Sequence, residues 1–165
     1  MLTYRVTSFS DVSRTIRDFG ATHLVSLVDP DMDAPLTPDT ISHHLVLKMH
    51  DVDHDRNLPG TPQDAQVADL IAFARALPAD ARVAFHCVAG RRRSTAAALI
   101  CDLATGPAAT PDRIDAAWQR LRNARPDADP NRALLRIADS QLRLGGALRD
   151  LRVVRHMTLD QHAKD

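Results

Sequence analysis

The segment that most constrains the fold runs from residue 82 to residue 103 and reads RVAFHCVAGRRRSTAAALICDL. Its first five residues are typical of a short buried strand, and Ser94 to Leu103 is typical of a buried helix. The connection between them is tight, and Gly90 allows it to curl so that successive backbone N–H groups point inward. Because a helix start also carries the positive end of the helix dipole, the segment predicts a binding site for an anion.

Strand-like and helix-like patterns alternate along the first half of the chain, and helical patterns fill most of the second half. Strands are expected at residues 4–8, 23–28, 43–49 and 82–86. Helices are expected at residues 10–19, 61–77 and 94–103, and two more are expected to open at residues 110 and 129. This order predicts an α/β fold, with a central, mostly parallel, twisted sheet of about four to five strands flanked by helices.

Capping residues and prolines predict where several helices begin and end. Ser10 is expected to cap the first helix, and Thr61-Pro62 to open the second. The pairs Thr110-Pro111 and Asp129-Pro130 are expected to open the last two helices. Gly145-Gly146 is expected to stop the final one, because glycine readily ends a helix.

Composition argues against several classes of function. The 165 residues include 21 Lys or Arg and 21 Asp or Glu, so no overall charge favours nucleic acid or a membrane surface. No signal-peptide pattern opens the chain, and its longest apolar run, 96–101, is too short to span a membrane. Two cysteines cannot make a dense disulfide framework. We expect one cytoplasmic domain over residues 1–165, with a core at about 20–142 and a tail at 146–165 of open role.

Three residues of the tight loop fit one kind of chemistry. A cysteine at a helix start, here Cys87, is stabilised as the thiolate and is nucleophilic below the ordinary pKa of a thiol. Arg93 follows six residues later, and its planar guanidinium can hold two oxygens of a phosphoryl group. Ser94 can donate a hydrogen bond to the sulfur when it acts as a leaving group. The other cysteine, Cys101, lies in an apolar helical pattern and is expected in the core.

The segment HCVAGRRRS matches every fixed position of the HCxxGxxRS signature of the cysteine-dependent protein tyrosine phosphatase superfamily. In organisation, the chain resembles a compact bacterial dual-specificity phosphatase over about residues 20 to 142. The resemblance implies a phosphomonoester hydrolase that forms a phosphocysteine on Cys87, with no cofactor and no metal ion. It also implies that His86 tunes and orients the cysteine. The residues expected to bind the substrate are Val88, Ala89, Gly90, Arg91, Arg92 and Arg93.

The same resemblance places a general acid on a loop about 30 residues before the cysteine, just after a strand. This region offers Asp51, Asp53 and Asp55. We favour Asp51, because it directly follows the strand expected at 43–49. Asp55 is the second choice and Asp53 the third. The Trp-Pro-Asp form of this loop, which larger tyrosine phosphatases carry, is absent.

The expected substrate is a phosphorylated protein or a small-molecule phosphoester, with no nucleic acid partner and no membrane insertion. Phosphotyrosine in proteins is the favoured substrate. Arg91 and Arg92 beside the pocket would, however, attract a polyanion such as a phosphoinositide or an inositol phosphate. Two other classes stay open: a phosphate-binding module with weak or no turnover, and a sulfur transferase. The histidines and aspartates of residues 43–55 are interpreted as loop residues rather than metal ligands. The Pro-Asn pair that contains Asn131 resembles a Ser-Pro-Asn segment that follows the catalytic helix in the dual-specificity group. A plain helix start explains the pair equally well, so Asn131 is not predicted as a site residue.

Overall fold

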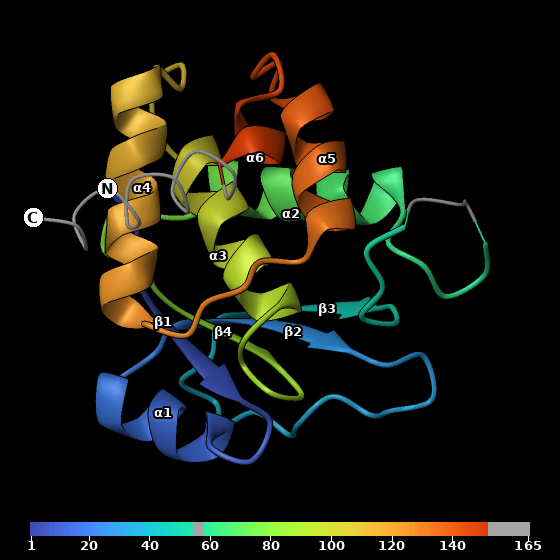
Figure 1. Ribbon diagram of the computed structural model, residues 1–165. Helices are drawn as coiled ribbons and strands as arrows, with labels where there is room; N and C mark the ends of the chain where they lie inside the picture. The colour runs from blue at the N-terminus through green and yellow to red at the C-terminus, as the bar shows by residue number, and fades with distance from the viewer. Residues whose placement is uncertain (55–57, 152–165) are drawn as a thin grey trace, which may run out of the picture.

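The computed structural model describes residues 1–54 and 58–151 of the chain (Figure 1). In this part, four strands form one sheet in the order β1-β4-β2-β3, and every neighbouring pair is parallel. The strands are β1 (Thr3–Ser8), β2 (His23–Val28), β3 (His43–Lys48) and β4 (Arg82–Cys87). The predicted α/β class and parallel sheet are therefore confirmed.

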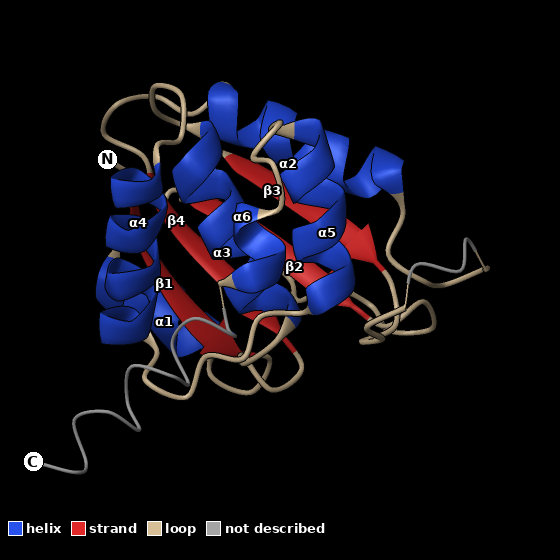
Figure 2. Cartoon of the chain, turned by 45° about the horizontal axis from the view of Figure 1, so that its top comes forward, coloured by secondary structure: helices blue, strands red, loops and turns tan. Residues whose placement is uncertain are grey.

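The helices lie on both faces of the sheet. Figure 1 shows α1 alone on one face, with the other helices on the opposite face, and Figure 2 shows the strands running beneath them. The helices are α1 (Val12–Phe19), α2 (Asp64–Arg75), α3 (Arg93–Ala104), α4 (Pro111–Ala124), α5 (Arg132–Gln141) and α6 (Ala147–Asp150). Among the described residues, none of these helices is long and apolar enough to cross a bilayer.

Burial follows from this layering. All six residues of β2 are buried, because a central parallel strand is covered on both faces. All twelve residues of α3 are buried as well, and its many alanines let the surrounding elements approach closely. A large core fills the space between the sheet and the helices α2 to α6. A smaller core, which includes Val12, Ile16 and Leu24, joins α1 to the other face.

The start of α4 agrees with the prediction, but the caps of α1, α2 and α5 differ from the predicted ones by one or two residues. Thr110 caps α4 and Pro111 is its first residue. The cap of α1 is Asp11 instead of Ser10. The hydroxyl of Ser10 instead lies 2.9 Å from that of Ser8. Asn131, and not Asp129, caps α5, because its side chain accepts a hydrogen bond from the backbone N–H of Leu134.

The start of α2 also lies two residues later than Thr61-Pro62 predicts. The hydroxyl of Thr61 donates to the carbonyl of Leu58 and so closes the preceding turn. The helix is capped instead by Gln63, in a capping box with Gln66. At the other end of the chain, α5 stops at Gln141, before the predicted glycine pair.

The parallel arrangement determines where the loops meet. Because all four strands run in the same direction, their carboxyl ends lie at one edge of the sheet. The residues that follow β2, β3 and β4 therefore come together there, although they are far apart in the sequence. This edge carries Asp29, the loop at residues 49–54, and the segment that begins at Cys87.

Candidate active site

The residues between β4 and α3 form a tight loop that only glycine can complete. Gly90 has a φ of +66°, in the left-handed region that side chains disfavour. A Cβ atom at this position would lie 2.5 Å from the backbone carbonyl of Thr7 in β1. The loop therefore packs directly against the backbone of the neighbouring strand.

Neighbouring groups hold four carbonyl oxygens of this loop. The carbonyl of Val88 accepts from the backbone N–H of Phe9, and that of Ala89 accepts from Arg125. The carbonyls of Arg91 and Arg92 accept from the backbone N–H groups of Asp129 and Asn131, and from the hydroxyl of Thr95. With these carbonyls engaged by surrounding residues, N–H groups of the same loop are free to point toward its centre.

Cys87 lies at that centre. Its thiol is buried, with Sγ 3.2 Å from the hydroxyl oxygen of Ser94. Burial raises the pKa of this thiol. Hydrogen bonds from the Ser94 hydroxyl and from the backbone N–H groups of Ser94, Arg91 and Arg92 lower the pKa, and together they outweigh the effect of burial. The net pKa is below the ordinary value of a thiol, so the loop favours the nucleophilic thiolate.

Arg93 is the buried cation of the site, with only 3% of its surface exposed. Its Nη1 atom donates to Asp29 at 2.8 Å and to the carbonyl of Met49 at 2.6 Å. Its Nε atom has no hydrogen-bond partner in the part of the chain that the structure describes. One buried donor therefore remains for an oxygen of a bound anion. The sequence analysis missed Asp29, although its position directly after the buried strand β2 was a usable signal.

His86 is fully buried beside Cys87, but its side chain lies on the other face of the sheet. Its Nε2 atom lies 2.6 Å from the hydroxyl oxygen of Ser26 in β2. Burial lowers the pKa of His86 to about 4, and the backbone of Cys87 offsets only part of this effect. The imidazole is therefore neutral near pH 7.

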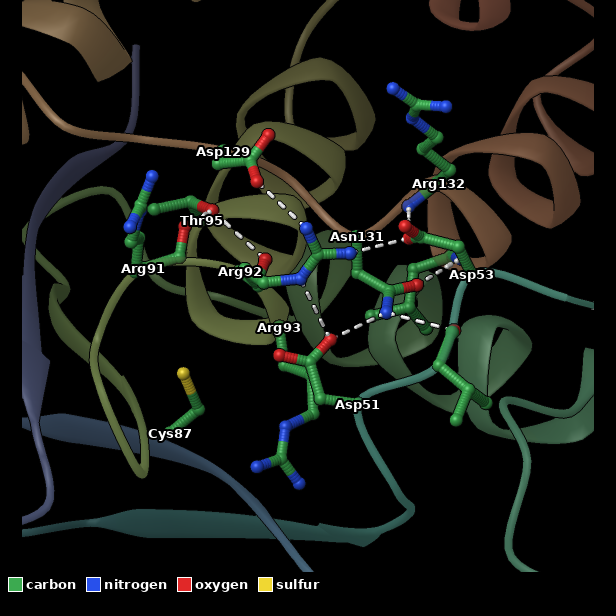
Figure 3. Close-up of polar contacts among 12 residues, drawn as sticks. Asp51, Asp53, Cys87, Arg91, Arg92, Arg93, Thr95, Asp129, Asn131 and Arg132 are labelled. Atoms are coloured by element: carbon green, nitrogen blue, oxygen red, sulfur yellow. Dashed lines mark hydrogen bonds and ion pairs between the residues drawn. The ribbon is translucent and has the colours of Figure 1, made fainter.

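Asp51 follows β3 as expected and lies in a network of polar groups near the loop, shown in Figure 3. Its Oδ1 atom accepts from the side-chain amide of Asn131 at 2.8 Å and from Nε of Arg92 at 3.2 Å. Figure 3 draws Asp51 within this network and Cys87 outside it. The carboxylate of Asp51 is thus held in place from two sides.

The other two candidate acids differ from Asp51. Asp53 accepts from the backbone N–H of Arg132 at 2.9 Å and from Arg92 at 2.6 Å. Burial raises the pKa of Asp53, but these bonds lower it by a larger amount. The net pKa is therefore below the ordinary value of an aspartate. A carboxyl group of this kind holds a proton poorly. Asp55 lies outside the described residues.

The arginines at positions 91 and 92 point to different partners. The guanidinium of Arg92 is paired with three carboxylates, those of Asp51, Asp53 and Asp129, and is therefore neutralised within the protein. Arg91 is exposed, and its Nε donates to the backbone carbonyl of Asp127 at 3.2 Å. Of these two side chains, Arg91 is the one that can approach an anion outside the pocket.

Asn131 connects the two loops of the site to α5. It is fully buried, and its amide donates to Asp51 and to the carbonyl of Val52. Its backbone N–H donates to the carbonyl of Arg92. The helix-start interpretation of the sequence was correct but incomplete, because the same side chain also holds the loop that carries Asp51. The Pro-Asn pair was the signal in the sequence.

Cys101 is fully buried in α3, as predicted, and burial raises the pKa of its thiol well above the ordinary value. It is therefore a packing residue, in contrast to Cys87. Within residues 1–54 and 58–151, no group of three or more His, Cys, Asp or Glu side chains is placed to hold a metal ion.

Solved structures with the same fold include phosphatases. Human DUSP28 superposes with a TM-score of 0.62 at 20% identity, over 87% of this chain and 94% of its own. The Yvh1 phosphatase domain from Chaetomium thermophilum gives 0.58 at 19% identity, over 86% and 90%. PTPMT1 in complex with PI(5)P gives 0.55 at 14% identity, over 86% and 90%. The sequence itself matches no protein-family model and no curated protein.

The architecture is thus that of the dual-specificity type of protein tyrosine phosphatase. At these identities the likeness concerns the fold. The chemistry depends on the residues of this chain.

Proposed function

We propose that the protein is a cysteine-dependent phosphomonoester hydrolase of the protein tyrosine phosphatase type. The observation that carries this proposal is the environment of Cys87. Its buried sulfur accepts hydrogen bonds from three backbone N–H groups and from the Ser94 hydroxyl at the start of α3. A structural cysteine has no need of this arrangement, and Cys101 in the same helix has the opposite shift in pKa. The phosphatase fold of the superposed structures supports the same proposal.

In the first step, the thiolate of Cys87 attacks phosphorus and the bond from phosphorus to the leaving oxygen breaks. Asp51 gives its proton to that oxygen. The loop N–H groups and the guanidinium of Arg93 hold the phosphoryl oxygens, whose charge increases in the transition state. In the second step, Asp51 removes a proton from water, which attacks phosphorus and releases the sulfur. The Ser94 hydroxyl, 3.2 Å from that sulfur, stabilises the departing thiolate.

Asp51 is assigned as the acid because of its surroundings. The carboxylate is held near the loop by Asn131 and Arg92 and keeps part of its surface exposed to solvent. Asp53 is a poor alternative, because its pKa is lowered by a backbone N–H and by Arg92. Asp51 also lies at the same edge of the sheet as Cys87 and its loop, which a general acid for this reaction needs.

The direct test is hydrolysis of p-nitrophenyl phosphate by the reduced protein in the presence of a chelator. Turnover is expected in the wild type and is expected to be absent in Cys87→Ser. Cys101→Ser is the matched control and should retain turnover, because that thiol lies in the core. If the folded, reduced wild type bound phosphate esters without turnover, a binding module would replace the proposed enzyme.

The acid role is tested with two leaving groups. Asp51→Asn should slow hydrolysis of an alkyl phosphate far more than that of p-nitrophenyl phosphate, since only the poor leaving group needs a proton. Asp53→Asn is the control for the loss of one carboxylate from the same loop. If the loss followed Asp53→Asn and spared Asp51→Asn, the acid role would belong to Asp53.

The proposed substrate class is phosphotyrosine in proteins, with a polyanionic phosphoester as the alternative. Exposed Arg91 favours the alternative, and a neighbour with this fold was solved with PI(5)P. Arg91→Ala should lower the ratio of activity on an inositol polyphosphate to activity on a phosphotyrosine peptide. Arg14→Ala, an exposed arginine of α1, is the charge-matched control. An unchanged ratio would leave phosphotyrosine as the proposed substrate.

A further inference from the structure

A row of polar side chains crosses the face of the sheet that α1 covers. His86 in β4 lies 2.6 Å from Ser26 in β2, measured from Nε2 to the hydroxyl oxygen. The same hydroxyl oxygen lies 2.7 Å from Nε2 of His44 in β3. His86 and Ser26 are fully buried, whereas His44 is partly exposed. The row therefore connects solvent to the residue that precedes the nucleophile Cys87.

The two short distances restrict where protons can lie. Ser26 has one hydroxyl proton, so it can donate to only one of the two ring nitrogens. The other ring nitrogen must carry a proton and donate to the serine oxygen, because two lone pairs would otherwise face each other. Only two arrangements satisfy both contacts. In one, His44 donates to Ser26 and Ser26 donates to His86; in the other, His86 donates to Ser26 and Ser26 donates to His44.

The charge of His44 selects between these arrangements. A charged imidazole has protons on both nitrogens and can only donate. Ser26 must then donate to Nε2 of His86, and the one proton of neutral His86 must lie on Nδ1. When His44 is neutral, the reverse arrangement is favoured. The reason is that Nδ1 of His86 is buried without a well-formed hydrogen bond among the described residues, whereas Nε2 has Ser26 as a partner.

We propose that His44 is a positioning residue for the Cys87 thiolate. Its protonation, relayed through the Ser26 hydroxyl, decides which nitrogen of His86 carries the proton. This proposal deepens the phosphatase function and rests on it only for the role of Cys87 as the nucleophile.

The effect on the thiol follows from the position of His86. Because Nε2 of His86 contacts Ser26, we assign to Nδ1 the interaction with the backbone of Cys87 that partly offsets the effect of burial, at a geometry too poor for a regular hydrogen bond. A donor at this point polarises the peptide group of Cys87 and favours the negatively charged sulfur. The positive charge of His44 acts in the same direction. Protonation of His44 therefore favours the thiolate, and the thiolate in turn favours protonated His44.

The charged groups around the row are few in the described part of the chain. On β3, His43 precedes His44, but its ring packs on the opposite face against Phe73 of α2. Burial lowers the pKa of His44, and His43 lowers it further. The residues of α1 that face the sheet here are apolar. On β4, His86 is influenced by His44 and Arg93. No carboxylate of the described residues shifts the pKa of His44 or of His86 appreciably.

The first experiment follows the imidazole nitrogens of the full-length protein by ¹⁵N NMR as the pH is lowered. His86 should change from the Nε2–H to the Nδ1–H form at the pH where His44 becomes protonated. This readout needs no variant and no turnover. A His86 ring that kept one tautomer throughout the titration of His44 would overturn the proposal.

The second experiment measures the rate of alkylation of Cys87 by iodoacetate against pH. The apparent pKa of the thiol should be about 0.7 unit higher in His44→Phe and in Ser26→Ala, a fivefold change in ionisation constant. His43→Gln should not raise the apparent pKa of the thiol, because its ring faces the other side of the sheet and its removal can only favour protonation of His44. Equal profiles in all four proteins would refute the relay. A protein that shows both effects but hydrolyses no phosphate ester would refute the phosphatase function alone.

Discussion

Asn131→Ala is expected to damage both the stability of the protein and the use of Asp51 as an acid. The side chain is fully buried and takes part in three hydrogen bonds. Its oxygen caps α5 through Leu134, and its amide donates to Asp51 and to the carbonyl of Val52. The substitution therefore removes a helix cap and, in the same step, releases the loop that carries the acid.

The size of the effect follows from these contacts. Loss of an N-cap costs about 1 kcal/mol. Loss of a hydrogen bond to a charged group costs about 1.5 to 3 kcal/mol, and Asp51 is partly exposed, which places its bond near the lower end. The loss of the cap and of the bond to Asp51 should therefore together lower the free energy of unfolding by roughly 2.5 kcal/mol.

Two matched variants separate the two roles. Thr110→Ala removes only a cap, that of α4, and should cost about 1 kcal/mol with unchanged catalysis. Asn131→Asp keeps an oxygen for the cap of α5 but replaces the donor to Asp51 with a second carboxyl group. It should therefore retain most of the stability and lose activity on poor leaving groups.

The assays are urea unfolding and the ratio of rates with p-nitrophenyl phosphate and an alkyl phosphate. Asn131→Ala should lower the rate with the alkyl phosphate more than the rate with p-nitrophenyl phosphate. If both substrates slowed equally, or if Asn131→Asp behaved as the wild type, the assignment of Asn131 as the residue that holds Asp51 would be wrong.

Three further predictions concern the loop. Gly90→Ala should lower the free energy of unfolding by more than about 2 kcal/mol, because it adds a backbone clash to left-handed strain. Gly145→Ala, where the new Cβ would have nothing within 4 Å, should lower it by only about 1 kcal/mol. Equal urea midpoints for the two variants would contradict this. Asp29→Asn should weaken inhibition by phosphate about 3- to 10-fold, because the buried Arg93 loses the charged partner that holds it in place. Tighter inhibition would instead show that Asp29 competes with the anion for Arg93. Ser94→Ala should raise the pKa of Cys87 in the pH profile of alkylation, since the thiolate loses a donor, and an unmoved profile would assign the low pKa to backbone N–H groups alone.

Local patterns in the sequence predicted most of the fold. Runs typical of buried strands, such as 23–28 and 82–86, identified the strands, and their alternation with helices predicted a parallel sheet. The segment around Cys87 predicted an anion site, because a glycine-containing loop at a helix start has consequences that depend only on neighbouring residues. Helix starts were less accurate, since Thr61 bonds to the preceding turn instead of capping α2.

The sequence by itself predicted the chemistry proposed for the loop, since the proposed nucleophile, its serine and its arginine lie within eight residues. Only the tertiary structure decided which distant groups serve them. Asp29 reaches Arg93 across 64 positions, and Asn131 reaches Asp51 across 80. His44 meets His86 through Ser26, a contact between three strands. Such pairs leave no local pattern, because their proximity arises from parallel strands that end at one edge of a sheet and from side chains that share one of its faces.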